Sequence, residues 1–178
     1  IVYNEDDGYY YFTASYPMNG GNDPDGYDRL VLRRAKTVAG LATAEEVTIW
    51  DEKDDPARGR FIWAPELHKI GDSWYFLSTA GINSGTGTTF NIRPFMVKCN
   101  NSDDMMNPAS WEMVGDVKPM AGDEANCLNA MSLDMTYFEA GGRHYLCWAD
   151  FTRNEGNPEG ISSLYIATID PSNPTQLT

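Results

Sequence analysis

The fold is decided by the stretch Ile62-Trp63-Ala64-Pro65-Glu66-Leu67-His68-Lys69-Ile70, with the turn Gly71-Asp72-Ser73 and then Trp74-Tyr75-Phe76-Leu77-Ser78. Gly and Asp mark a tight turn, and the aromatic and apolar residues on both sides are typical of strands. The stretch therefore predicts a β-hairpin. Its one carboxylate near the start, Glu66, is expected just before the first strand.

The same arrangement occurs again around Asp134. This carboxylate is followed by an apolar and aromatic segment at 135–138, a glycine-rich turn and a second segment at 144–148. A third copy opens the sequence, with segments at 1–4 and 9–13, and its carboxylate position is expected at or before Ile1. Glu66 and Asp134 lie 68 positions apart, so the chain is organised as a repeat.

Each repeat contains further segments rich in β-branched and aromatic residues, which we expect to be strands. They lie at 30–35, 47–50, 95–99, 111–114 and 163–169. A turn of helix fits only at 38–46, and residues 170–178 are expected to connect to one more strand. Repeated antiparallel four-stranded sheets are typical of a β-propeller. The expected blade units are 1–60, 61–128 and an incomplete 129–178; a complete β-sandwich with chance likeness between strands is the alternative.

Composition narrows the function. The net charge of −13 argues against a nucleic-acid partner, because phosphate binding needs clustered Lys and Arg. No apolar run approaches the length of about 18 residues that a membrane span requires, and no signal peptide is visible. The three cysteines form no CxxC pair and the two histidines lie far apart, so we expect free thiols, no zinc and no cofactor. Secretion and a cytoplasmic location both stay open.

Three segments in chain order carry a resemblance to a known family: Tyr27–Ala35, Trp63–His68 and Ser132–Glu139. Together they resemble glycoside hydrolase family 43, most closely its α-L-arabinofuranosidase-like members, and the resemblance runs through the whole chain. It implies an all-β, five-bladed β-propeller, of which this chain would cover roughly the first two and a half blades. It also implies an inverting hydrolase that cleaves α-L-arabinofuranosyl linkages in arabinan or arabinoxylan.

The resemblance implies three acids, of which one maps onto this chain. Asp134 matches the Asp that orients the general acid and tunes its pKa. The general base, an Asp in an Asp-Pro motif before the first strand, is expected ahead of Ile1, and the general acid, a Glu, beyond Thr178. Asp23 and Asp55 precede prolines but follow the first strand, so neither fits the base. The remaining blades, in the same or a partner chain, would complete the enzyme, and the isolated chain is expected to be inactive.

Three more residues are candidates for binding an oligosaccharide or polysaccharide. Glu66 either contacts a sugar hydroxyl or hydrogen-bonds the start of its strand. Trp63 either stacks on a sugar ring or packs between blades. Asp28 either approaches the pocket or pairs with its neighbour Arg29. His68 lies two residues after Glu66 and so on the same side of a strand, where we expect it to be a structural partner.

Other functions remain open at this stage. Xylosidases and endo-arabinanases share the implied architecture, and a non-catalytic carbohydrate-binding propeller or inactive fragment is the alternative from another class. Loops at Met18–Gly26 and Asp51–Arg60 are placed to shape specificity. No set of metal ligands is recognisable in the sequence.

Overall fold

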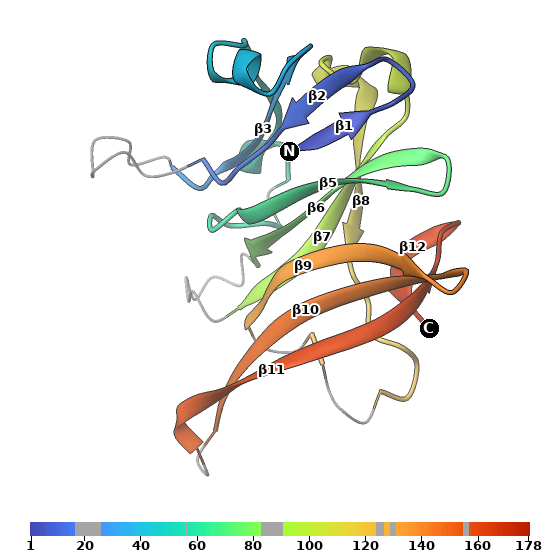
Figure 1. Ribbon diagram of the computed structural model, residues 1–178. Helices are drawn as coiled ribbons and strands as arrows, with labels where there is room; N and C mark the ends of the chain where they lie inside the picture. Colours follow the sequence, from blue (N-terminus) through green and yellow to red (C-terminus); the bar gives the residue numbers. More distant parts are fainter. Residues whose placement is uncertain (17–25, 56, 83–90, 124–126, 129–130, 155–156) are drawn as a thin grey trace.

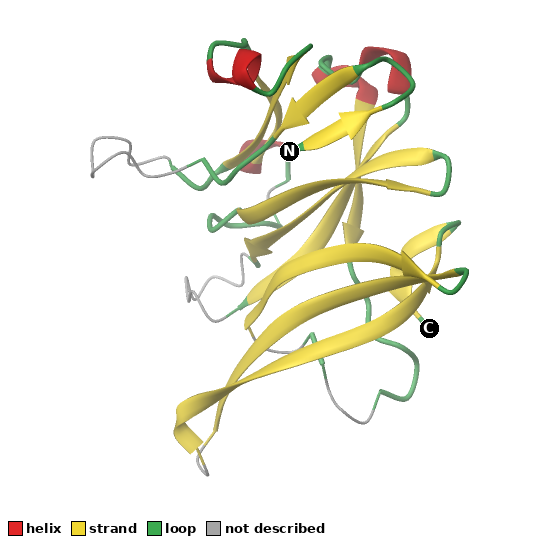
Figure 2. Cartoon of the chain, viewed as in Figure 1, coloured by secondary structure: helices red, strands yellow, loops and turns green. Residues whose placement is uncertain are grey.

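The computed structural model describes residues 1–16, 26–55, 57–82, 91–123, 127–128, 131–154 and 157–178. Within these residues, strands account for nearly all regular structure, and the helices are short 3₁₀ turns (Figure 2). One of these turns, Ala39–Ala42, falls inside the segment where a helical turn was expected. The predicted all-β class is therefore confirmed. The Met18–Gly26 loop lies almost entirely outside the described residues.

The strands form three antiparallel sheets of four, arranged one after another along the chain (Figure 1). The first sheet contains β1 (Val2–Asn4), β2 (Tyr9–Phe12), β3 (Arg29–Ala35) and β4 (Glu46–Asp51). The second contains β5 (Trp63–Ile70), β6 (Ser73–Gly81), β7 (Ile92–Cys99) and β8 (Trp111–Asp116). The third contains β9 (Met131–Ala140), β10 (Arg143–Asn154), β11 (Asn157–Asp170) and β12 (Asn173–Leu177).

The second sheet packs between the other two sheets, which cover both of its faces. Because side chains alternate along a strand, Phe76 points into the core shared with the first sheet and Leu77 into the core shared with the third. Both side chains are essentially inaccessible to water. Burying a side chain of this size contributes about 1.5–3 kcal/mol. This explains why β6 is apolar on both faces rather than alternating with polar residues.

The third sheet differs from expectation at its end. The residues expected only to connect to a further strand include β12, which pairs with β11 through Ile169–Leu177 and Asp170–Asn173. Gln176 also forms a parallel bridge with Lys118, which follows β8. β12 thus completes a third sheet of four strands and links it to the second. The prediction of a third unit lacking its last strand is wrong, because five residues with few strand-forming side chains are held by pairing with the preceding strand β11 and by the bridge to Lys118.

Among the described residues, no helix is long and apolar enough to cross a membrane.

Candidate active site

Asp134 lies inside β9, at a β-bulge, and not before the strand as expected. Leu133 pairs with Ala149 and Thr136 with Cys147, so Asp134 and Met135 together oppose the single residue Trp148. The backbone of Asp134 has a φ of 54°, a left-handed conformation that Asp tolerates better than most residues. Such a bulge redirects the side chain of its strand and is frequent beside active sites. The Asp134 side chain is solvent-exposed.

The second sheet has a matching bulge at Ala64. Trp63 pairs with Thr79 and Glu66 with Leu77, so two residues again oppose one, and Ala64 has a φ of 45°. Counting from these bulges, Ala64 is the counterpart of Asp134, and Glu66 is the counterpart of Thr136. The overlay of Glu66 on Asp134 is therefore wrong by two residues. Aligning the two carboxylates in the sequence gives the wrong register, because the register is determined by the cross-strand pairs.

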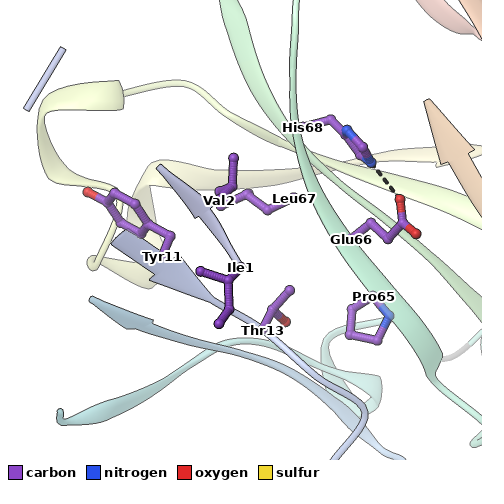
Figure 3. A pocket seen from close by; sticks show the side chains of 8 residues that line it. All are labelled: Ile1, Val2, Tyr11, Thr13, Pro65, Glu66, Leu67 and His68. Atoms are coloured by element: carbon purple, nitrogen blue, oxygen red, sulfur yellow. Dashed lines mark hydrogen bonds and ion pairs between the residues drawn. The ribbon is translucent and has the colours of Figure 1, made fainter. Parts of the chain in front are cut away.

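Glu66 lines a cavity of about 290 Å³ between the first sheet and β5 (Figure 3). Residues of both sheets contribute to its wall: Ile1, Val2, Tyr11, Thr13, Pro65, Glu66, Leu67 and His68. The side chain of Glu66 is 42% exposed. Its carboxylate Oε2 lies 2.6 Å from Nε2 of His68, which confirms that these two residues lie on the same side of the strand.

The surroundings of Glu66 favour its charged form. Burial would raise its pKa, but hydrogen bonds from His68 and from Thr136 on β9 outweigh burial and lower the pKa below its ordinary value. The carboxylate is therefore ionised at neutral pH and accepts hydrogen bonds. Thr136 comes two residues after Asp134, so the contact between Glu66 and Thr136 brings the two carboxylate-bearing strands of neighbouring sheets together.

Trp63 lies edge-on to two aromatic rings. Its centroid is 6.0 Å from that of Tyr27, at an interplanar angle of 89°, and 5.2 Å from that of Phe61, at 63°. The side chain is partly exposed and does not line the Glu66 cavity. This packing agrees with the alternative that Trp63 is a structural residue between blades. The stacking of Trp63 on a sugar stays a prediction.

Asp28 is only 1% exposed and forms a two-point ion pair with its neighbour. Arg29 Nε donates to Oδ1 at 2.6 Å, and an Arg29 terminal nitrogen donates to Oδ2 at 2.7 Å. Charged groups are rarely buried unless they are paired in this way. The Arg29 guanidinium also lies 4.3 Å from the ring centroid of Tyr16. Asp28 thus forms the local salt bridge that was one of the two alternatives. A role of Asp28 in binding the substrate stays a prediction.

One buried carboxylate next to the strand that carries Asp134 was not predicted from the sequence. Asp150, on β10, is 5% exposed; it accepts hydrogen bonds from the hydroxyl of Ser132, on β9, and from the backbone amide of Leu128 at 3.1 Å. Leu128 itself has a φ of 58°. The buried carboxylate thereby anchors the beginning of the strand that carries Asp134. In the sequence, Asp150 could have been found because it follows Leu146 and Trp148 at a spacing of two, which places it on the same buried face of the strand.

Metal binding has no candidate in the part of the chain that the structure describes, where no three His, Cys, Asp or Glu side chains gather in a suitable cluster. The three cysteines are free thiols, as expected.

Successive four-stranded antiparallel sheets are the blades of a β-propeller, and sequence comparison identifies the family. The chain matches the glycosyl hydrolases family 43 over residues 1–177. It therefore belongs to this family.

Four curated relatives are named as arabinofuranosidases. The chain is 38% identical to alpha-L-arabinofuranosidase B of Pyricularia oryzae, over 91% of the chain and 29% of that protein. It is 36% identical to an extracellular exo-alpha-(1->5)-L-arabinofuranosidase of Streptomyces avermitilis, over 94% of the chain and 30% of that protein. The crystal structure of alpha-L-arabinofuranosidase from Lactobacillus brevis is 34% identical and superposes with a TM-score of 0.76, covering 99% of this chain and 49% of that one.

The chain thus spans about a third of the two curated relatives and about half of the solved structure. The superposition confirms the five-bladed β-propeller architecture that the resemblance implied, of which the three sheets are part.

Proposed function

We propose that this chain is part of an inverting α-L-arabinofuranosidase that acts on arabinan or arabinoxylan. One observation carries the proposal: Asp134 is held by a bulge on β9, beside the strand contact between Thr136 and the Glu66 carboxylate. The arabinofuranosidase names of relatives at 34–38% identity support the choice of sugar.

In this proposal Asp134 acts on the general acid. Inverting hydrolysis uses an acid to protonate the leaving oxygen and a base to activate water, about 6.5–9.5 Å apart. A third carboxylate near the acid raises the pKa of that acid by like-charge repulsion and so keeps it protonated. The bulge at Asp134 aims an exposed carboxylate for this task. The base and the acid come from other parts of the enzyme, outside residues 1–178.

Glu66 has a different role in the proposal. Its ionised carboxylate lines the cavity and is an acceptor for a sugar hydroxyl, while His68 and Thr136 occupy part of its hydrogen-bonding capacity. A charge-assisted hydrogen bond of this kind contributes about 1.5–3 kcal/mol. Glu66 therefore contributes to binding the substrate and Asp134 to the chemical step.

The remaining blades pack against the outer face of the third sheet. Large apolar side chains are exposed there, with Leu164 at 82%, Ile166 at 59% and Phe138 at 38%. An apolar sheet face of this kind is typical of an interface, and in a propeller each sheet buries its faces against its neighbours. The greater length of the relatives supports further blades as the occupant of this face.

The test is an assay of the full-length protein that contains this chain. We expect it to release arabinose from an aryl α-L-arabinofuranoside and from arabinan, with inversion detected by NMR of the first sugar anomer formed. Release of xylose alone from an aryl β-xyloside would reassign the enzyme within the family. Absence of hydrolysis with intact sugar binding would favour a non-catalytic carbohydrate-binding propeller.

A further inference from the structure

His68 has a position that the proposed catalytic and binding roles do not use. It lies on β5, two residues after Glu66, and its side chain is 23% exposed. Its ring meets the ring of Tyr137, on β9, edge to face, with centroids 5.6 Å apart at an interplanar angle of 71°. The imidazole is therefore held on one side by packing and on the other by Glu66.

Tyr137 is itself fixed in place. It is 8% exposed, and its hydroxyl donates to Glu139 Oε1 at 2.7 Å and lies 2.7 Å from Nδ1 of His144. Because the single hydroxyl hydrogen goes to Glu139, His144 is the donor in the second contact. The ring against which His68 packs thus has little freedom to rotate.

The contact between His68 and Glu66 determines which atom carries the hydrogen. Glu66 is ionised and only accepts, so the hydrogen of the 2.6 Å contact belongs to Nε2 of His68. This bond engages Oε2, and Thr136 on β9 gives the carboxylate a second hydrogen bond. Without the His68 contact, only the hydrogen bond from Thr136 would hold the half-exposed carboxylate, and other rotamers of Glu66 become accessible.

We infer that His68 is a positioning residue, which holds the Glu66 carboxylate in the orientation that receives a sugar hydroxyl. This inference rests on the proposed function, because it assigns Glu66 to an arabinosyl group. His68 thereby strengthens the binding of that sugar in the pocket. His68 acts through Glu66 and exchanges no proton with the substrate.

A double-mutant cycle in the full-length protein tests this role. His68→Phe keeps a ring against Tyr137 and removes the donor, and we expect it to raise KM for the aryl arabinofuranoside about tenfold with kcat little changed, as for lost uniform binding. Glu66→Gln should raise KM at least as much. Because His68 acts only through Glu66, the double variant should match Glu66→Gln alone.

Two further variants separate positioning from mere packing. His68→Gln retains a donor and should recover part of the lost affinity. Lys69→Gln changes the next residue of β5, which pairs with Asp6 at 2.7 Å and away from the cavity; its KM should equal that of the wild type. Thermal unfolding of each variant checks that the fold is retained.

A binding measurement keeps the inference testable whether or not the protein cleaves. Calorimetry with an arabino-oligosaccharide, on Asp134→Asn as background, should give a Kd about tenfold higher when His68→Phe is added. Unchanged Kd and KM, or fully additive effects in the cycle, would overturn the positioning role while leaving the proposed function standing. Absence of both arabinoside hydrolysis and arabino-oligosaccharide binding in the wild type would overturn both.

Discussion

Ala64 on β5 and Asp134 on β9 take the same left-handed backbone conformation at the same bulge of two consecutive sheets, with φ values of 45° and 54°. Alanine has no side-chain group that favours this conformation, so the bulge belongs to the architecture of the repeat rather than to the carboxylate. The scaffold and the chemistry at this position are therefore separable by mutation.

Asp134→Asn and Asp134→Gly are expected to fold and to lose activity. Both residues tolerate positive φ, so the free energy of unfolding should stay within about 0.5 kcal/mol of the wild type. Removing the carboxylate should lower kcat by about 10²–10⁴-fold. Asp134→Val should also lose about 1–2 kcal/mol of stability because a β-branched residue is strained there. Urea unfolding and initial rates test this; activity of Asp134→Asn within a few-fold of wild type would refute the assigned role.

Glu66→Gln is expected to change how stability depends on pH. The pKa of Glu66 is lowered in the folded state, because hydrogen bonds from His68 and Thr136 outweigh the effect of burial. A depressed pKa stabilises the fold above the unfolded-state pKa, and that contribution disappears as the pH falls through the folded-state pKa. With 42% of the side chain exposed, the contribution should be below about 1 kcal/mol.

The measurement is urea unfolding of wild type and Glu66→Gln between pH 7 and pH 3. Wild type should lose stability relative to the variant in the acidic part of this range and not between pH 7 and pH 5. A difference between the two proteins that does not vary with pH would contradict the lowered pKa.

Cys127 is expected to react slowly with alkylating reagents. Burial and the hydrogen bond from its Sγ to Asp123 Oδ2, at 2.9 Å, raise the pKa of the thiol to about 12. Since the thiolate is the reactive form, iodoacetamide at pH 8 should modify Cys127 far more slowly than a cysteine in an unfolded peptide. Asp123→Asn removes a negative charge that raises this pKa and should increase the rate. Mass spectrometry of the labelled protein reads both rates, and labelling as fast as in the peptide would count against this environment.

The isolated 178-residue chain is expected to self-associate through the outer face of its third sheet. Leu164 and Ile166 lie there at 82% and 59% exposure, and exposed apolar sheet faces favour association. The double variant Leu164→Lys, Ile166→Lys should shift the sedimentation profile toward the monomer. Val38→Lys is a matched control, because Val38 is also 51% exposed but flanks a 3₁₀ turn.

In the full-length protein, the same double substitution should be destabilising. There the proposed next blade would cover Leu164 and Ile166, so two buried lysines should lower its stability. Unchanged stability of the full-length variant would argue against a blade on this face.

Local patterns in the sequence were sufficient to predict the all-β class, the hairpin turns near Gly71 and Gly141, and the pairing of Glu66 with His68. Each depends on residues close in the chain: strand alternation has a period of two, and turns need residues such as glycine. Strands such as β7 and β11 extend beyond the predicted segments, since pairing with neighbours continues past the apolar residues that mark them, whereas β1 and β2 are each one residue shorter than predicted.

Only the tertiary structure decided the register of the repeats and the environment of the candidate site. The equivalence of Ala64 with Asp134 follows from cross-strand pairs, and the contact of Glu66 with Thr136 from packing between two sheets. The strand β12 follows from pairing with β11 and from the bridge to Lys118, which comes after β8. A bulge adds one residue without any marker in composition, and long-range contacts join segments about 70 residues apart. Composition and spacing thus specify which strands form, whereas pairing and packing specify where each carboxylate points.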